Sequence, residues 1–204
     1  MSTSAYGSIL TGDDVHAAVA ATISTWAPSY VAEMSRQKGI VLPAIRNFGN
    51  EQDITPNLPI DAFPVCVIVT PGTTSPVEVR GDGTVAVWWA LGVGVVVADV
   101  HYDAAQQQAH LYTGLLRTLL LQQRALGGLA TDTRLESEDV SELAWNTDHT
   151  VFSGRIELAV RLTSIANRSA GPATPPADPL VADTLPTVAT TGIALTKVPV
   201  TKPV

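Results

Sequence analysis

One long run of β-branched, aromatic and small residues, from Thr84 to Val100, most constrains what this chain can fold into. Such residues favour extended backbone, and the run is shorter than the roughly 20 apolar residues that a transmembrane helix needs. Alternate side chains of a strand point to opposite faces. One face would carry mainly large side chains and the other mainly small ones: Val85, Val87, Trp89, Leu91, Val93, Val95 and Val97 against Ala86, Trp88, Ala90, Gly92, Gly94, Val96 and Ala98. We expect the large face to carry the core and the small face to allow close approach of another backbone or a helix.

Helix signals precede this run. Thr11 and Asp14 form a capping-box pattern, and Gly39 is typical of the residue that ends a helix. Pro28 lies between them, and a proline inside a helix removes a hydrogen bond and clashes with the preceding turn. We therefore expect this helix to break at Pro28 and to continue as a second, shorter piece.

A second principal helix is expected directly after the run, with Asp103 as its N-cap and an end near Arg124. It carries a wide apolar stripe made of Leu111, Tyr112, Leu115, Leu116, Leu119 and Leu120. Such a stripe predicts that the helix packs against a sheet.

Four further segments have strand patterns: residues 64–70, 76–80, 135–145 and 151–165. Gly81-Asp82-Gly83 predicts a hairpin into the long run. The last segment alternates between apolar and polar residues, so Phe152, Gly154, Ile156, Leu158, Val160 and Leu162 should face inward. Residues 40–63 contain three prolines and should form an irregular connection. The whole order predicts an α+β fold: a mainly antiparallel sheet with two principal helices packed on one face.

Composition changes near residue 169 and divides the chain into an α+β domain, residues 1–168, and an extended Pro/Thr-rich C-terminal arm, residues 169–204. The arm holds half of the chain's 14 prolines and no aromatic residue, so it cannot build a core alone. A strand-like rhythm persists within it, at Ile193, Leu195, Val198 and Val200. We expect these residues to bind a partner, and adding a strand to the partner's sheet edge is the natural mode.

The charge of the chain argues against a nucleic-acid-binding surface, because its net charge is −7 and phosphate binding needs clustered Lys and Arg. Only 15% of residues are charged, a low fraction that is typical of extensive burial in a core or an assembly. The first residues lack the pattern of an export signal, and we expect the protein to be cytoplasmic where it is made. Cys66, the one cysteine, lies in an apolar run and is expected to be a buried small hydrophobe.

No motif in the chain predicts catalysis or cofactor binding. Gly92 and Gly94 match only a fragment of a dinucleotide fingerprint. Two histidines and two carboxylates, Asp99, His101, Asp103 and His110, could bind a metal, but Asp103 is better explained as an N-cap. We therefore predict a protein that is not an enzyme, with no catalytic, cofactor-binding or metal-binding residues.

Several segments nevertheless resemble a known family. They are Thr25-Trp26-Ala-Pro-Ser-Tyr30, Phe63-Pro-Val-Cys-Val-Ile-Val-Thr-Pro-Gly72, Asp82-Gly83, Trp88-Trp-Ala-Leu-Gly-Val-Gly-Val95, and the Ala/Gln/Leu-rich helix with Tyr112. Residues 10–166 together resemble the tail terminator proteins of long-tailed, siphovirus-type phages that infect actinobacteria, a group related to the lambda-type tail terminator.

The resemblance implies a structural virion protein, assembled in the host cytoplasm, that forms a ring, usually hexameric, at the head-proximal end of the tail tube. Such a ring ends tube polymerisation and joins the tail to the head. Its partners would be the tail tube protein and the head–tail connector proteins, with DNA passing through the lumen without specific binding and no membrane involved. We hypothesise that Glu136, Glu138 and Asp139 line the lumen; the alternative is that they solvate an outer strand.

Two other interpretations remain open. The chain could be another neck or tail component, namely a head-completion protein or a tail tube subunit. It could also be a small α+β enzyme or ligand-binding domain, which should show an apolar pocket with convergent polar groups.

Overall fold

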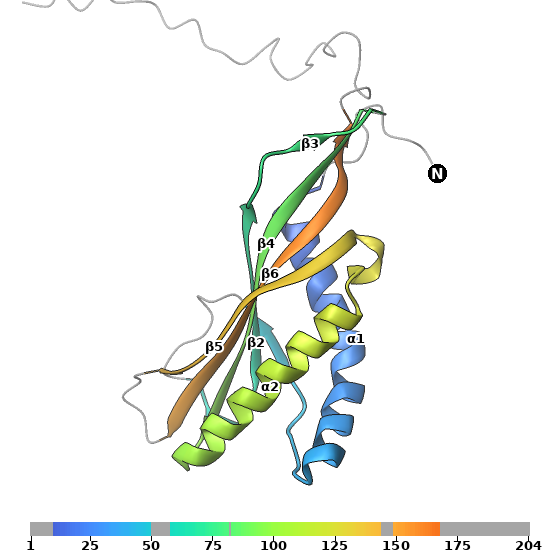
Figure 1. Ribbon diagram of the computed structural model, residues 1–204. Coiled ribbons are helices and arrows are strands. Elements are labelled where there is room, and N and C mark those ends of the chain that lie inside the picture. The colour runs from blue at the N-terminus through green and yellow to red at the C-terminus, as the bar shows by residue number, and fades with distance from the viewer. Residues whose placement is uncertain (1–9, 50–57, 82, 144–148, 168–204) are drawn as a thin grey trace, which may run out of the picture. The chain divides into compact units, whose positions relative to one another are not determined.

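A computed structural model describes residues 10–49, 58–81, 83–143 and 149–167, which form two helices on one face of a six-stranded sheet (Figure 1). The order of strands is β1 (Asn47–Gly49), β2 (Val65–Thr73), β4 (Thr84–Asp99), β6 (Thr150–Asn167) and β5 (Ala130–Leu143). The short β3 (Glu78–Val79) also pairs with β4. Only the β1–β2 pair is parallel in this sheet, so the predicted α+β class with a mainly antiparallel sheet is confirmed. No helix within these ranges is long and apolar enough to cross a membrane.

The central strand β4 has the two faces that its sequence predicts. Its large residues pack under the helices, with Val87, Leu91, Val93, Val95 and Val97 buried in the main core. From the neighbouring β6, the predicted inward residues Phe152, Ile156, Leu158, Val160 and Leu162 join the same core. The face of the sheet that the helices cover is called the covered face below, and the opposite side is called the open face.

The first helix, α1 (Gly12–Lys38), is continuous, so the predicted break at Pro28 is wrong. Thr11 and Asp14 form the capping box, and Gly39 ends the helix with a φ of 66°. Buried residues continue past the proline, from Ala27 to Val31, and their packing outweighs the hydrogen bond that Pro28 lacks. The residue whose carbonyl loses its partner, Ser24, is exposed, so water can bond that carbonyl.

The second helix, α2 (Tyr102–Gln122), lies directly on the sheet. The leucines and Tyr112 of its predicted stripe are buried, apart from the partly buried Leu111. A Cβ on Gly154 of β6 would lie 2.0 Å from Thr113 Oγ1 and 2.9 Å from the Ala109 carbonyl oxygen, which shows how closely the helix approaches. The predicted N-cap is wrong by two residues: His101 is the cap and Asp103 lies in the first turn, near the positive end of the helix dipole.

At both edges of the sheet the strands differ from those that the sequence pattern predicted. Residues 40–63, expected to be irregular throughout, contain β1 and a 3₁₀ turn at Ile60–Ala62. At the other edge β5 begins at Ala130, five residues before the expected start, because a turn at Leu126–Gly128 leads straight into it. Strand β5 therefore forms a long outer edge.

Candidate assembly surface

In the described structure, hydrophobic side chains bury only part of the open face. A small second cluster, made of Phe63, Val65, Val67, Val96 and Val151, buries that face where β2, β4 and β6 meet the segment before β2. Beyond this cluster, β4 presents Ala86, Trp88, Ala90 and Gly92 on the same side. No helix of the described ranges packs there, but only Trp88 and Ala90 of these four residues are partly exposed, whereas Ala86 and Gly92 are buried.

A stack of two guanidinium groups and one indole stands on this face. The Arg134 guanidinium lies 4.1 Å from the centroid of the Trp88 ring, and that of Arg161 lies 6.0 Å from it. Arg161 Nη2 also lies 2.5 Å from Glu78 Oε2, and Arg134 Nε lies 3.6 Å from Asp132 Oδ2. Cation–π contacts hold these side chains against the sheet. Sequence analysis missed this stack, although Trp88 is a large residue on an otherwise small face, and Arg161 is its register partner on β6.

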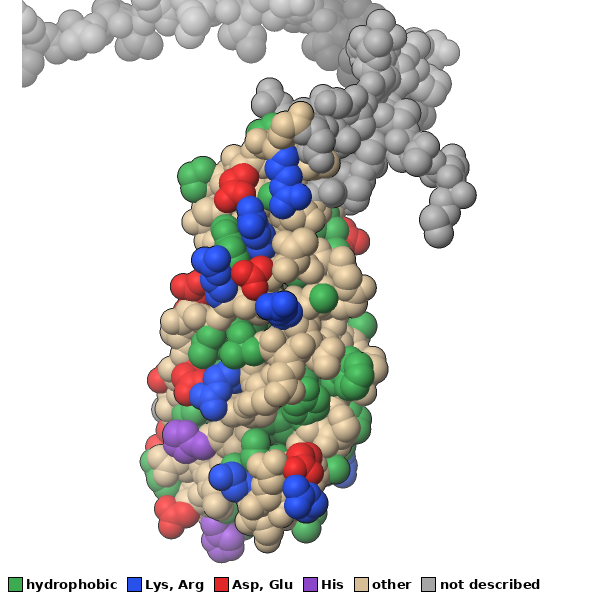
Figure 2. Space-filling view, turned by 45° about the vertical axis from the view of Figure 1, so that its right-hand side comes forward, with side chains coloured by type: hydrophobic (Ala, Val, Ile, Leu, Met, Phe, Trp, Pro, Cys, Tyr) green, Lys and Arg blue, Asp and Glu red, His purple; other side chains and the backbone are tan. Residues whose placement is uncertain are grey.

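Next to this stack the small residues leave a shallow hollow of about 440 Å³, lined by Pro71, Thr74, Ala90, Gly92, Glu136, Arg155 and Glu157 among others. Arg155 lies over Gly92, where an added Cβ would meet its Nη2 atom at 3.4 Å. Arg155 pairs with Glu157 at 3.3 Å, and both side chains are half exposed. On the face seen in Figure 2, basic and acidic side chains are likewise interspersed rather than gathered into fields of one sign. The hollow is lined by apolar as well as charged residues.

Strand β5 is the outermost strand of the described sheet and pairs only with β6. From Arg134 to Glu142 every residue except the half-buried Val140 is exposed. Two register irregularities, between Ala130 and Asp132 and between Leu135 and Ser137, interrupt the pairing. Every second residue of such an edge directs its backbone N–H and C=O groups outward, where another strand can bond them.

The three acids expected to line a lumen lie on β5 but do not share one face. Glu138 is on the covered face, where its Oε2 atom lies 2.8 Å from Arg117 Nη1 of α2. Asp139 is the register partner of Arg155, on the open face, and Glu136 lines the hollow there. Simple alternation would place Glu136 and Glu138 on the same face of the sheet. The irregularity between Leu135 and Ser137 places them on opposite faces. A lumen wall formed by the open face would therefore contain Glu136 and Asp139 but not Glu138.

The four residues considered for a metal site do not converge. Asp99 accepts bonds from the His101 backbone N–H at 3.0 Å and from Gln108 Nε2 at 3.1 Å. His110 instead lines a separate surface hollow with Arg117, Glu138 and Asp139. Among the residues that the structure describes, no group of three or more His, Cys, Asp or Glu side chains is placed to hold a metal ion.

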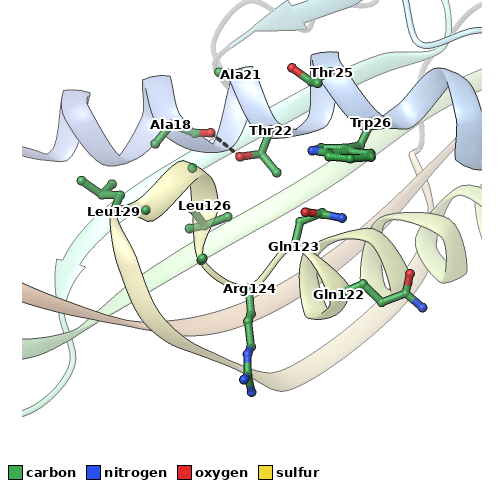
Figure 3. A pocket seen from close by; sticks show the side chains of 13 residues that line it. Ala18, Ala21, Thr22, Thr25, Trp26, Gln122, Gln123, Arg124, Leu126 and Leu129 are labelled. Atoms are coloured by element: carbon green, nitrogen blue, oxygen red, sulfur yellow. Dashed lines mark hydrogen bonds between the residues drawn. The ribbon is translucent and has the colours of Figure 1, made fainter.

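A groove of about 920 Å³ lies between α1 and the turn that follows α2 (Figure 3). Trp26, 44% exposed, stands at its side near Gln123, and Arg124 points away from α1. The Thr22 hydroxyl is already bonded to the Ala18 carbonyl at 2.8 Å. Arg124 is the one ionisable residue among those that line the groove, so they supply no acid–base pair for catalysis.

Cys66 is fully buried in the main core, as expected of a small hydrophobe. Burial raises the pKa of its thiol to about 12, so at neutral pH the group is a protonated thiol and a poor nucleophile. The predicted partner-binding residues Ile193, Leu195, Val198 and Val200, with the rest of the arm from residue 169, lie outside the described residues.

Protein-family models and curated sequences provide no relative of this chain. Its function is therefore argued from the surfaces described above and from the sequence.

Proposed function

We propose that this chain is a structural subunit that assembles into a closed ring. The observation that carries the proposal is the outer edge of β5, which pairs with no further strand of the described sheet, beside an open face that carries the partly exposed arginine–tryptophan stack. An unpaired edge can bond another strand, although the charged side chains and register irregularities of β5 restrict which strands can pair with it. A contact between the β5 edge of one subunit and a different surface of the next is heterologous, and such contacts close into a ring when the rotation permits.

The particular ring that the sequence resemblance supports is the tail terminator of a long-tailed phage. In that role the ring, expected to be a hexamer, would sit on the head-proximal end of the tail tube. There it would end tube polymerisation and bind the head–tail connector. The α+β body with both helices on one sheet face agrees with this role, since part of the opposite face, beyond its small hydrophobic cluster, has no helix over it in the described ranges. The low charged fraction of 15% agrees with it as well.

Passage of DNA through the ring would need a lumen that does not bind phosphate. The open face of β5 offers Glu136 and Asp139 for this purpose, and repulsion between carboxylates and phosphates would keep the genome mobile. Glu138, paired with Arg117 on the covered face, is left out of this wall.

The test is the native mass of the purified full chain over a concentration series, with negative-stain images of the same samples. Closed rings that cap isolated tail tubes and stop their growth would support the proposal. Open-ended tubes would identify a tail tube subunit instead. A chain that stays monomeric and does not bind tube ends would overturn the proposal in favour of a head-completion protein, an enzyme or a ligand-binding domain.

A further inference from the structure

The two outermost strands of the described sheet, β1 and β5, are complementary to each other. We infer that β5 of one copy pairs with β1 of the next copy, with Val140 beside Phe48 and Glu142 beside Arg46, so that the sheet continues from subunit to subunit. This inference rests on the proposed function and deepens it, because it names the surface that the β5 edge of a neighbouring subunit meets. Strand direction, position along the sheet and charge support it.

Strand direction allows the sheet to continue around a ring. β1 and β5 are the two ends of the strand order. The β1–β2 pair is parallel and the three pairs from β2 to β5 are antiparallel, so β1 and β5 run in opposite directions. A rotation about an axis along the strands preserves both the strand direction and the covered face. Repetition around such an axis therefore places β5 antiparallel to β1 of the next copy, with the covered faces in line.

Residues paired from strand to strand form rows across the sheet, and these rows show which parts of the two edges are level. The row that begins at Phe48 of β1 ends at Val140 of β5, with three residues between them: Cys66, Val95 and Gly154. The row lies on the covered face, because Cys66 is in the main core. Phe48 is 37% exposed and Val140 is half-buried at the margin of the core. Continuation of the sheet without stagger therefore places these two apolar side chains together.

A charged pair follows from the same geometry. Asn47 is level with Ser141. Because the two strands are antiparallel, Arg46, which precedes Asn47, is level with Glu142, which follows Ser141. Both charged side chains are exposed, and neither forms an ion pair with another described residue. Arg46 Nη1 donates only to the carbonyl oxygen of Asp61, at 3.4 Å. Opposite charges facing each other across two strands stabilise the pair.

Charge also disfavours the pairing of two β5 edges. Residues 137–143 contain no basic side chain and three acids: Glu138, Asp139 and Glu142. Two such edges side by side would set like charges against each other, which destabilises a strand pair. Arg46 is the one charged residue between positions 40 and 49, so the β1 edge presents the opposite sign. The register of β5 is regular from Ser137 onward, since both irregularities precede it.

The β1 end of the sheet also has the composition of a contact surface. Near Phe48, Val41 is 94% exposed and Ile60 is 42% exposed. Asn47 Nδ2 donates to the Ala62 carbonyl oxygen at 2.8 Å, which holds the 3₁₀ turn that contains Ile60 beside β1. Protein interfaces are enriched in aromatic residues and arginine. The occupant of the β5 edge is therefore the β1 edge of a second copy.

Exchange of the two charges tests the contact in the full-length chain, with native mass measured over a concentration series. Glu142→Lys and Arg46→Glu each set like charges opposite each other, so each should raise the concentration at half assembly by about tenfold or more. A mixture of the two variants should assemble like the parent, because contacts between alternating copies then join opposite charges. The matched control, Glu136→Lys, makes the same change of charge on β5 outside the stretch that is level with β1, and should assemble like the parent.

Disulfide formation tests the same contact directly, also where assembly is weak. In a chain with Asn47→Cys and Ser141→Cys the new thiols lie at opposite edges of the sheet, about 19 Å apart over four strand spacings. A disulfide within one chain is excluded at this distance, and the native Cys66 is buried. Mild oxidation should give a ladder of linked chains, at least about tenfold more than either single-cysteine variant gives.

Two results would overturn the inference. One is a ladder no stronger than that of the single-cysteine variants, including dimers of the Ser141→Cys chain alone, which would show that two β5 edges pair. The other is a mixture of the two charge variants that assembles no better than either variant alone.

The outcomes separate this inference from the proposed function. Closed rings that are insensitive to the charge exchange and give no ladder would leave the ring intact and reject this contact. A ladder from a chain that neither closes into rings nor caps tail tubes would establish the contact and reject the terminator role.

Discussion

The two faces of the sheet are built from the same strands in opposite ways. On the covered face, β4 and β6 contribute large apolar residues with almost no exposed surface, and α2 approaches so closely that Gly154 has no room for a side chain. On the open face β4 contributes mainly small residues, and the side chains of Arg134 from β5 and of Arg155 and Arg161 from β6 lie over Trp88 and Gly92. Alternation along one strand therefore separates a surface packed under the helices from a surface covered by long polar side chains.

This contrast has an energetic consequence. A close-packed interior responds to the addition of a single methyl group, because its neighbours cannot move away. A face covered by flexible arginines can adjust at small cost. Matched substitutions on the two faces should therefore differ in their effect on the free energy of unfolding.

The first pair places a methyl group on each face. Gly154→Ala should lower the free energy of unfolding by about 3 kcal/mol, because the new Cβ would overlap Thr113 Oγ1 and contact the Ala109 carbonyl of α2. Gly92→Ala should change it by less than about 1 kcal/mol, because its Cβ would meet Arg155 Nη2 at 3.4 Å, where a long side chain can shift. Urea unfolding followed by the helical signal measures both. Equal losses for the two variants would refute the contrast between the faces.

The second pair uses adjacent tryptophans. Trp89→Ala should cost about 2 kcal/mol, because the half-buried Trp89 packs against the main core beside α1. Trp88→Ala should cost about 1 kcal/mol, the contribution of guanidinium stacking on a partly exposed ring. Thermal unfolding of the two variants gives the comparison. A larger loss for Trp88 would mean that the stack on the open face, rather than the core, holds the strands together.

These contrasts also show what the sequence could and could not predict. The alternation of Val93 with Gly94 and the leucine stripe of α2 predicted the sheet, its covered face and the helix that lies on it, since apolar periodicity follows directly from burial. The continuity of α1 through Pro28 was not predictable, because it depends on the packing of Ala27 and Val31 against other elements. The face of each β5 acid depends on one extra residue near Ser137, which no alternation rule contains. The Arg134–Trp88 stack joins residues on strands β5 and β4, which the intervening β6 separates, and so required the sheet order.

A third prediction concerns the thiol on the covered face. Burial raises the pKa of Cys66 from 9.0 to about 12, so the unfolded chain loses its thiol proton at lower pH than the folded chain. The stabilisation is complete below pH 9 and is lost as the pH rises toward 12, about 1 kcal/mol of it by pH 10. The free energy of unfolding of Cys66→Ala should therefore fall less steeply above pH 9 than that of the parent chain. Parallel curves for the two proteins would show that Cys66 is not buried as described.

The rate at which a cysteine reacts with a thiol reagent is an independent test of the difference in exposure between the covered face and the β5 edge. Cys66 should react with a thiol reagent only as fast as the protein unfolds, whereas a Ser141→Cys substitution on the exposed β5 edge should react at once. Rapid labelling of the parent chain at pH 8 in the absence of denaturant would contradict the burial of Cys66.

The smallest effects on stability are expected for the acids of β5, and their differences bear on function. Glu138→Gln should cost at most about 0.5 kcal/mol, the contribution of the exposed ion pair with Arg117, and this loss should vanish in high salt. Asp139→Asn, on the other face, should be neutral within that range. If the open face of β5 lines the lumen, Asp139→Lys should slow DNA ejection from phage particles, whereas Glu138→Lys should leave it unchanged, because Glu138 lies on the helix side of the strand and pairs with Arg117. Both substitutions change the charge of a subunit by the same amount, so equal slowing by the two would show that passage depends on the net charge of the ring rather than on one face of β5.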